Sequence, residues 1–568
     1  MDNPTTGRPA EPGRARFHPW GVCLLAALLA AGCSARHYRN SADKDTYATI
    51  RQKAPFVSNM VEQFTIDLTN APDLTHLPLT RETNAFLGVA AAAEIGAGVI
   101  SLEQALDLGV RHSRTYQDNR EQLFLTALSL TLARHQWTPI FSGGGTTALN
   151  YQKSASDGLA ENYNATANTT AGVDWLIRDI GKISVAATSD FLRYISGSPG
   201  TITSSQVGLT FTHPLLQDAG YQAEMETLTQ SERDLMYQLR AFVQFRKTFS
   251  VQIASAYYGV LSNRDAARNA YLNWQGSRRA GDRTRALAAE GRTTQTDLGR
   301  IEQQELSAEA GWIDAVRAYQ SALDNFKIQL GIPVDARVVL DDRELATLEI
   351  RQPKLATEEA IKVALAARLD FQTLTDELAD TLRKIKVAKN QLLPQIDFVA
   401  GAGLSGGPQT NGFARPGFAN SYWNAGANVN LPLDRVAERN NYRTALIARE
   451  QATRAVDLLR DTIRQQVRDS WRALEQARRE YEISKIGVRL AERRVEEQEL
   501  LADLGRAKAL DQVDAQNALL SSKDQLTQAL VNHTIDRLQF WDQLGILYIK
   551  DKGRWVEHTA EETKMETR

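Results

Sequence analysis

One segment of this 568-residue chain occurs twice. Residues 291–331 align with residues 505–545 without a gap, at a separation of 214 positions. Asp297 in the first segment corresponds to Asp511 in the second, and the sequence Gln-Leu-Gly-Ile stands at the end of both. Internal duplication at a long period means that one structural unit is used twice. The fold must therefore contain two copies of a mostly helical unit.

The first residues have the pattern of an export signal. Arg14, Arg16 and His18 precede an apolar run at 20–31, which is too short to span a bilayer. The run ends in Ala-Ala-Gly-Cys, which resembles a bacterial lipoprotein signal with Cys33 as the lipid-modified mature N-terminus. The alternative is an ordinary secretory signal with an incidental cysteine.

A lipoprotein signal would make residues 1–32 a signal peptide and residues 33–100 a lipid-anchored extension. In such proteins, a serine after the cysteine, here Ser34, favours sorting to the outer membrane. Cys23 would be removed, so the mature chain would keep one cysteine and no disulfide. We expect packing alone to stabilise the fold.

The first repeat is predicted at 101–332. An amphipathic helix is expected at about 102–136, and period-two alternation within 138–213 predicts a strand insertion. Helical periodicity then returns at about 215–289 and, after a turn, at 294–331. The two later helices form a predicted antiparallel hairpin.

The second repeat is predicted at 357–548 with its strand insertion at 395–431. A connector at 333–356 joins the repeats, and a tail at 549–568 follows. Within the second long helix, apolar and small residues alternate spacings of four and three, which predicts a left-handed coiled-coil seam. The seam comprises Ile463, Val467, Ser470, Leu474, Ala477, Tyr481, Ser484, Val488, Ala491 and Val495.

Helix lengths predict the architecture. The helix at 215–289 would span roughly 110 Å at 1.5 Å per residue, and the helices at 102–136 and 294–331 are each half as long. Each repeat is therefore expected to pack one long helix against two short helices stacked end to end. A narrow seam cannot close a soluble core around such rods, so we expect the chain to oligomerise.

The strand insertions predict two strands per repeat and four per chain. A further hairpin at 171–194 would either add strands or lengthen loops. Because the exported chain has no apolar segment long enough for a spanning helix, a membrane-crossing portion would have to be a closed β-barrel shared between copies. Candidates for an interfacial aromatic belt are Trp137, Tyr151, Trp175, Tyr194, Tyr422 and Trp423.

The duplicated unit, the turn at 504–515 (Leu-Gly-Arg-Ala-Lys-Ala-Leu-Asp-Gln-Val-Asp-Ala) and the Leu-Pro-Leu at 431–433 resemble the TolC family of outer-membrane efflux channels. The resemblance covers about 101–548. It implies a mainly α fold with a membrane β-barrel portion: a homotrimer whose long antiparallel helices form an α-barrel in the periplasm, topped by a shared 12-strand barrel in the lipid of the outer membrane. It further implies a periplasmic adaptor and an inner-membrane pump of the RND or ABC class as partners, and no cofactor.

The resemblance also implies a periplasmic gate at the hairpin turns. Gly291 and Gly505 mark the turns, and Asp511 and Asp514 occupy the positions of the carboxylates that ring the closed end in this family. Thr296 and Asp297 lie at the matching turn of the first repeat. Asp511 also lies in the first turn of a helix, where a carboxylate favours the helix dipole without any gating role. Ala507 stands where a family gate arginine can occur, which leaves that latch open to question.

Basic residues crowd the first hairpin tip. They would dock an adaptor or simply form a solvated helix end; they are Arg278, Arg279, Arg283, Arg285 and Arg292.

Other function classes have weak support. With 66 basic and 68 acidic residues interspersed along the chain, there is no excess charge to attract nucleic acid. The Gly-rich sequence at 401–406 matches a dinucleotide-binding fingerprint, but more loop residues follow it where a helix should begin. No metal-binding HExxH motif occurs, so we do not expect an enzyme. The rival to a channel is a lipid-anchored coiled-coil scaffold that crosses the periplasm without a pore.

Overall fold

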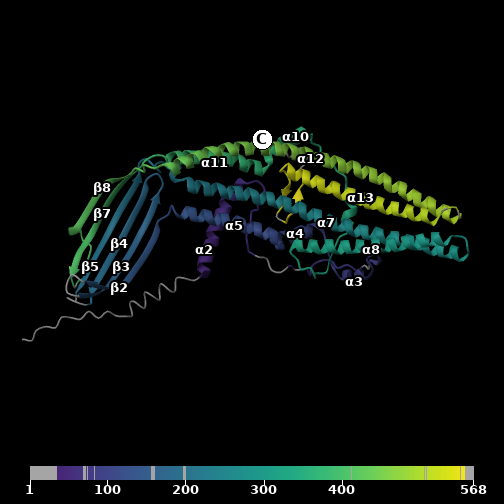
Figure 1. Cartoon of the computed structure of the whole chain (residues 1–568), viewed down its shortest axis with the longest axis horizontal. Coiled ribbons are helices and arrows are strands. Elements are labelled where there is room, and N and C mark those ends of the chain that lie inside the picture. Colours follow the sequence, from purple (N-terminus) through teal and green to yellow (C-terminus); the bar gives the residue numbers. More distant parts are fainter. Residues whose placement is uncertain are drawn as a thin grey trace, which may run out of the picture.

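The computed structural model describes residues 35–67, 72, 74–81, 84–154, 160–195, 200–410, 412, 414–504, 506, 508–550 and 552–556. The molecule is elongated, with a β-sheet at one end and long helices that run to two hairpin tips at the other (Figure 1). Cys33, Gly505 and Ala507 lie outside the described residues.

The first repeat contains one long helix and two stacked groups of shorter ones. Helices α5 and α8 pack along α7, α5 on the half near the sheet and α8 on the half near the tip (Figure 1). The bounds are α4 Leu102–His112, α5 Arg114–His135, α6 Tyr221–Glu224, α7 Glu226–Ala289 and α8 Gln295–Leu330. Stacked short helices beside a long helix are thus confirmed for this repeat.

Two details of the predicted helices are wrong. The helix expected at 102–136 is broken at Ser113, which is extended and buried. The long helix begins at Glu226 rather than at 215, because Asp218 and Gly220 both have positive φ, which an α-helix cannot contain.

The second repeat has the same plan. Its helices are α10 Thr357–Ala367, α11 Leu369–Asn390, α12 Val436–Asp503 and α13 Ala509–Gln543. The three shorter helices have 11, 22 and 35 residues, which together equal the 68 residues of α12. The predicted seam lies on the packed side of α12, since Ile463, Val467, Leu474, Ala477 and Ala491 are buried.

A glycine in the left-handed conformation locks the stacked helices in both repeats. Gly331 ends α8 with φ +78°, and a Cβ there would collide with the carbonyl oxygen of His112, at the break between α4 and α5. Gly545 after α13 has φ +75°, and a Cβ there would lie 3.1 Å from the carbonyl oxygen of Ala367, at the break between α10 and α11. Only glycine permits this close approach.

The sheet has six antiparallel strands in the order β2-β3-β4-β5-β7-β8. The strands are β2 Ile140–Ser154, β3 Ala160–Ile177, β4 Gly181–Tyr194, β5 Thr201–Pro214, β7 Gln395–Thr410 and β8 Ser421–Asn430. The expectation of two strands per repeat is therefore wrong for the first repeat, which supplies four. The predicted hairpin at 171–194 is longer, spanning 160–194, and it adds strands rather than a loop.

The remaining segments pack around the middle of the helical body. The N-terminal segment contains α2 Ala35–Lys53, η1 Ala54–Phe56, η2 Ala85–Ala90, α3 Ala91–Glu94 and β1 Gly98–Ile100; the connector contains β6 Val338–Leu340 and α9 Arg343–Ala346. Strand β1 pairs in parallel with β6. η3 Phe418–Asn420 precedes β8, and β9 Tyr548–Ile549 pairs with β10 Trp555–Val556.

Among the residues that the structure describes, no helix combines the length and the apolarity needed to cross a membrane.

Candidate functional site

The sheet has one apolar face. Strand register places the odd-numbered residues of β2, β3, β4, β5 and β8 on the same face as the even-numbered residues of β7. We call this the apolar face; its large side chains include Phe141, Leu149, Tyr151, Tyr163, Val173, Trp175, Val185, Phe191, Val207, Leu209, Phe211, Phe398, Trp423 and Val429. Several are strongly exposed, with Trp423 at 82% and Leu149 at 80%. A contiguous exposed apolar surface of this kind marks a lipid or protein contact.

Aromatic side chains concentrate near both ends of this face. Phe141 and Trp175 lie near the helical body, whereas Tyr151 and Tyr163 lie near the far end, with ring centroids 4.9 Å apart and ring planes tilted by 39°. Ten residues separate Phe141 from Tyr151 along β2, which is about 34 Å at ~3.4 Å per residue. A strand tilt of about 40° reduces this to roughly 26 Å, close to the height of the apolar band of an outer-membrane barrel.

The sequence-based belt candidates divide between the two faces. Tyr151, Trp175 and Trp423 lie on the apolar face, whereas Tyr194 and Tyr422 lie on the opposite one. Trp137 precedes β2 and belongs to no strand.

The opposite face is polar, and we call it the polar face. Asn150 donates to Asn164 at 3.0 Å, Ser184 donates to Asp174 at 2.6 Å, and Lys182 pairs with Asp174 at 3.3 Å. Other members include Asn168, Asp190, Ser204, Gln206, Thr210, Asn424 and Asn428. A sheet that is apolar on one face and polar on the other can separate lipid from a water-filled lumen.

The predicted gate carboxylates lie at the hairpin tips, at the end of the molecule opposite the sheet (Figure 1). Asp511 and Asp514 are exposed in the first two turns of α13. Thr296 and Asp297 are exposed in the first turn of α8, where the hydroxyl of Thr294 caps the helix by accepting from the Asp297 backbone N–H at 3.1 Å. Gly291 turns the first hairpin with φ +72°.

The two tips meet within one protomer. Ala280 of α7, Ile301 of α8 and Val513 of α13 form a small buried apolar cluster. Beside it lies a cavity of about 550 Å³, lined by Arg283, Thr284, Leu287, Arg292, Thr293, Asp297, Arg300, Ile301, Ala502, Leu504, Lys508, Leu510 and Gln512. The structure thus brings Asp297 to the junction between the hairpins.

The five tip arginines have different surroundings. Arg285 pairs with Asp282 and Glu305, and Arg283 donates to the carbonyl of Ala502 at the end of α12. Arg278 lies 5.8 Å from the ring centroid of Trp274, and Arg279 is exposed. Arg292 pairs with Glu290 at 3.5 Å with both side chains mostly exposed. Of the five, Arg285 and Arg283 therefore make structural contacts in addition to any role in docking.

Sequence reasoning missed a ladder of polar contacts between α7 and α13. Asn273 donates to Asn517 at 3.0 Å, Asn269 donates to Asp524 at 2.8 Å, and Thr527 donates to Asp265 at 2.8 Å. Burial and the nearby charge of Asp265 raise the pKa of Asp524. The two hairpins therefore meet through a row of hydrogen bonds between α7 and α13.

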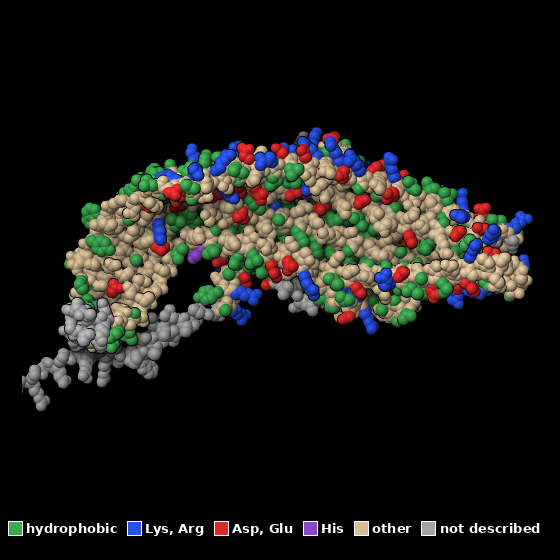
Figure 2. All heavy atoms as spheres, viewed as in Figure 1, with side chains coloured by type: hydrophobic (Ala, Val, Ile, Leu, Met, Phe, Trp, Pro, Cys, Tyr) green, Lys and Arg blue, Asp and Glu red, His purple; other side chains and the backbone are tan. Residues whose placement is uncertain are grey.

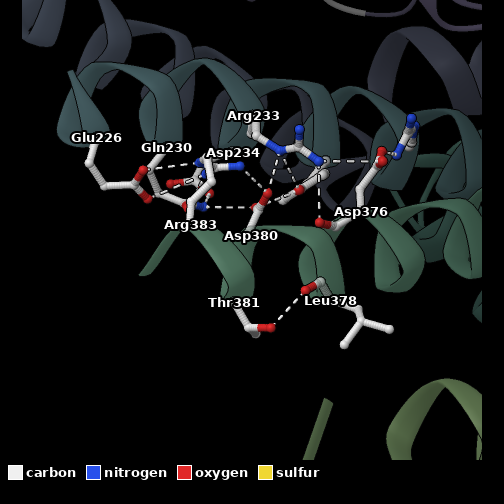
Figure 3. A network of polar contacts seen from close by, with 11 residues as sticks. Glu226, Gln230, Arg233, Asp234, Asp376, Leu378, Asp380, Thr381 and Arg383 are labelled. Carbon is white, nitrogen blue, oxygen red and sulfur yellow. Dashed lines mark hydrogen bonds and ion pairs between the residues drawn. The ribbon is translucent and has the colours of Figure 1, made fainter. Parts of the chain in front are cut away.

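A buried charge network, which the sequence analysis also missed, joins α7 of the first repeat to α11 of the second (Figure 3). Asp380 of α11 is 2% exposed and contacts Arg233 at 2.5 Å, Arg383 at 2.6 Å and the Tyr237 hydroxyl at 2.6 Å. Arg383 also pairs with Glu226 of α7 at 3.0 Å. Burial, then the bond to Asp380, raises the pKa of Tyr237, so its hydroxyl remains a donor.

A second network holds the N-terminal segment against the first repeat. Arg264 of α7 is buried and pairs with Glu94 at 3.0 Å and with Asp342 at 3.1 Å. The Tyr319 hydroxyl of α8 donates to Glu94 at 2.7 Å. The N-terminal segment, the connector and both hairpin helices are therefore joined at one buried arginine.

The described residues contain no cluster of three or more acidic, histidine or cysteine side chains that could hold a metal. Charged side chains of both signs are spread over the helical body on the face seen in Figure 2, and few lie on the sheet. This surface shows no dominant basic patch.

Residues 360–542, most of the second repeat, match the model of the outer membrane efflux protein family. No curated protein matches this sequence significantly.

Several solved outer-membrane proteins have the same fold. The chain resembles the Campylobacter jejuni CmeC outer membrane channel with a TM-score of 0.59 at 14% identity, covering 90% of this chain and 98% of that one. The outer membrane protein VceC from Vibrio cholerae matches with a TM-score of 0.57 at 15% identity, covering 78% and 96%. The open state of the Neisseria gonorrhoeae MtrE outer membrane channel matches with a TM-score of 0.55 at 14% identity, covering 78% and 89%.

These matches are to channels rather than enzymes, as the sequence analysis expected for this chain. The resemblance inferred from the duplicated unit is confirmed: the second repeat matches the outer membrane efflux protein family, and the chain as a whole has the fold of outer-membrane efflux channels.

Proposed function

We propose that the protein is the outer-membrane exit channel of a tripartite efflux or type I secretion system. It would act as a homotrimer in which three sheets close a barrel across the outer membrane and three helical bodies form a tube in the periplasm. The observation that carries the proposal is the open sheet with one apolar and one polar face at the end of a long helical body.

Conduction in this proposal is passive. The polar face would line the lumen mainly with amide and hydroxyl groups such as Asn150 and Thr210, together with the Lys182–Asp174 ion pair, and these groups hydrate readily. The apolar face would contact lipid, and the strands satisfy one another's backbone groups, as a membrane-spanning sheet requires. Energy would come from the pump, since the channel needs no reaction of its own.

The proposed periplasmic end consists of the hairpin tips. Three copies of Asp511 and Asp514 would surround a narrow mouth with six carboxylates, which favours cations and repels anions. Thr296 and Asp297 would contribute the contacts between hairpins that keep the mouth closed. A periplasmic adaptor would dock at the tips, where Arg278, Arg279 and Arg292 present positive charge, and it would connect the channel to an RND or ABC pump.

Conductance and mass together test the proposal. Purified full-length protein, reconstituted into planar bilayers, should give stepwise conductance, and its protein mass in detergent should equal three chains. A monomeric mass with no conductance at any voltage would reject the channel and favour the lipid-anchored scaffold.

A further inference from the structure

We infer that three copies of this chain close an 18-strand barrel, rather than the 12-strand barrel that the TolC resemblance implies. The inference rests on the proposed trimeric channel and concerns the width of its passage through the membrane. It follows from the hairpin of β3 and β4, which lies in the middle of the sheet rather than beyond its edge.

The hairpin is paired along both sides. Strand β3 aligns with β2 from Ser154 opposite Ala160 to Ile140 opposite Asp174, and β4 aligns with β5 from Arg193 opposite Thr201 to Lys182 opposite Thr212. An extracellular loop lying over a four-stranded sheet would leave β2 next to β5. Here the hairpin separates those strands completely.

The hairpin also has the two-faced pattern of a membrane strand. On the apolar face, Val173 lies opposite Val185 and Trp175 lies opposite Ile183. On the polar face, Asn168 lies opposite Asp190 and Asp174 lies opposite Ser184. The apolar residues continue across the sheet into β5, where Leu209 lies opposite Val185 and Phe211 lies opposite Ile183. A hairpin in water on both sides has no need for this alternation.

Both edges of the sheet are available to neighbouring copies. All ten residues of β8 are exposed, as are residues 140–151 of β2, whereas the four inner strands are partly covered. Because neighbouring strands alternate in direction across six strands, β8 of one copy is antiparallel to β2 of the next. Three sheets therefore join without a parallel pair, and no edge remains unpaired.

The insertion widens the sheet without changing the helical body. It lies between α5 and α7, which pack together as α11 and α12 do in the repeat that lacks it. Barrel diameter grows roughly in proportion to strand number, so the membrane passage would be about 1.5 times as wide as that of a 12-strand relative. The narrowest point then lies in the helical tube, and the barrel sets no size limit on the solute.

Matched substitutions on β4 test whether the hairpin is part of the barrel wall. Val185→Arg places a charge on the apolar face, and Ser184→Arg places the same charge on the polar face beside Asp174. If β4 contacts lipid, Val185→Arg should lower the yield of heat-resistant trimer in outer membranes at least about tenfold, while Ser184→Arg stays near wild type. Equal yields for the two variants would place the hairpin outside the wall and overturn the inference.

Electron cryo-microscopy of the full-length protein in lipid nanodiscs counts the strands directly. Three copies with eighteen strands are expected, and deleting residues 160–194 should leave three copies with twelve, since β2 and β5 are antiparallel. A wild-type trimer with twelve wall strands would refute the wider barrel and leave the channel intact. Two copies sharing twelve strands, or no barrel, would reject the trimeric channel itself.

Discussion

Buried charged side chains form ion pairs between the two repeats. Asp380 is almost inaccessible and contacts two arginines and a tyrosine, so its carboxylate offsets charges from both α7 and α11. No periodicity argument finds such a residue, because in sequence Asp380 is one more acidic residue on an amphipathic helix. Its role depends on which long-range neighbours the fold supplies.

Replacing Asp380 should destabilise the protein strongly. Asp380→Ala leaves Arg233 and Arg383 without their shared buried carboxylate, and removal of one member of a buried ion network costs about 3 kcal/mol. The midpoint of urea unfolding, followed by circular dichroism, measures the loss. Asp314→Ala removes an exposed carboxylate 3.6 Å from Arg317 and should change little. Equal midpoints for the two variants would contradict the role of the network.

Lys247 should make the protein more stable as the pH rises above about 8. It is buried and donates to the carbonyl of Gly545 at 2.6 Å, and burial lowers its pKa to about 8. Between pH 8 and 10.5 the unfolded chain binds this proton more than the folded one does, so folding becomes more favourable as pH rises. The gain is on the order of 2–3 kcal/mol. Lys247→Met should abolish the rise in unfolding midpoint between these pH values, and a rise of the same size in the variant would exclude Lys247 as its source.

The gate assignment predicts a change in ion selectivity. Asp511→Asn with Asp514→Asn removes six negative charges from the mouth of a trimer, so conductance should rise or cation preference should fall. Reversal potentials in a salt gradient across a planar bilayer measure the preference. Asp314→Asn, on α8 away from the tip, is the control. Single-channel behaviour identical to wild type in the double variant would remove these residues from the gate.

Helices and hairpin turns were the elements that sequence predicted best. The 3.5-residue seam of α12 and the first hairpin turn at Gly291 follow from local spacing, and both are present. The breaks at Ser113 and Arg368 were missed because neither position carries a proline or a glycine that would mark the end of a helix. At each break the backbone lies against a left-handed glycine from a later part of the chain, Gly331 or Gly545.

Two glycine substitutions separate the effect of steric crowding on stability from the effect of a strained backbone conformation. Gly331→Ala combines a positive φ with a collision against His112, whereas Gly291→Ala has positive φ with nothing within 4 Å of the new Cβ. Gly291→Ala should cost about 1 kcal/mol, the price of a left-handed alanine. Gly331→Ala should cost several times more, because α4 and α5 must move. Similar thermal midpoints for the two variants would show that α4 and α5 move apart at little cost in stability.

At the scale of the whole molecule, the sequence predicts that one long helix packs against stacked short helices, but it predicts too few strands. The alternation at 171–194 was visible, yet alternation alone cannot say whether a hairpin joins a sheet or lies above it. Pairing with β2 and β5 decides that, and pairing is a long-range property. The gate and the lipid anchor depend on neighbouring copies and on processing, so they stay predictions.

Attachment to lipid is testable in cells. Metabolic labelling with a radioactive fatty acid should label the wild type and leave Cys33→Ala unlabelled, because the thiol of Cys33 is the predicted acceptor of the lipid. An unlabelled wild type would indicate an ordinary secretory signal. Labelling that persists in Cys33→Ala would place the lipid on another residue.

The hairpin of β3 and β4 lies in the chain segment that joins α5 to α7. These two helices pack together as α11 and α12 do in the repeat without the hairpin. Any further insertion at this position must again bring strands in pairs, because an odd number would point the returning chain away from α7. In the proposed trimer, the barrel circumference could then grow only in steps of six strands. The width of the proposed pore would thus change in fixed steps through one insertion, and the helical body that is proposed to meet the adaptor would stay the same.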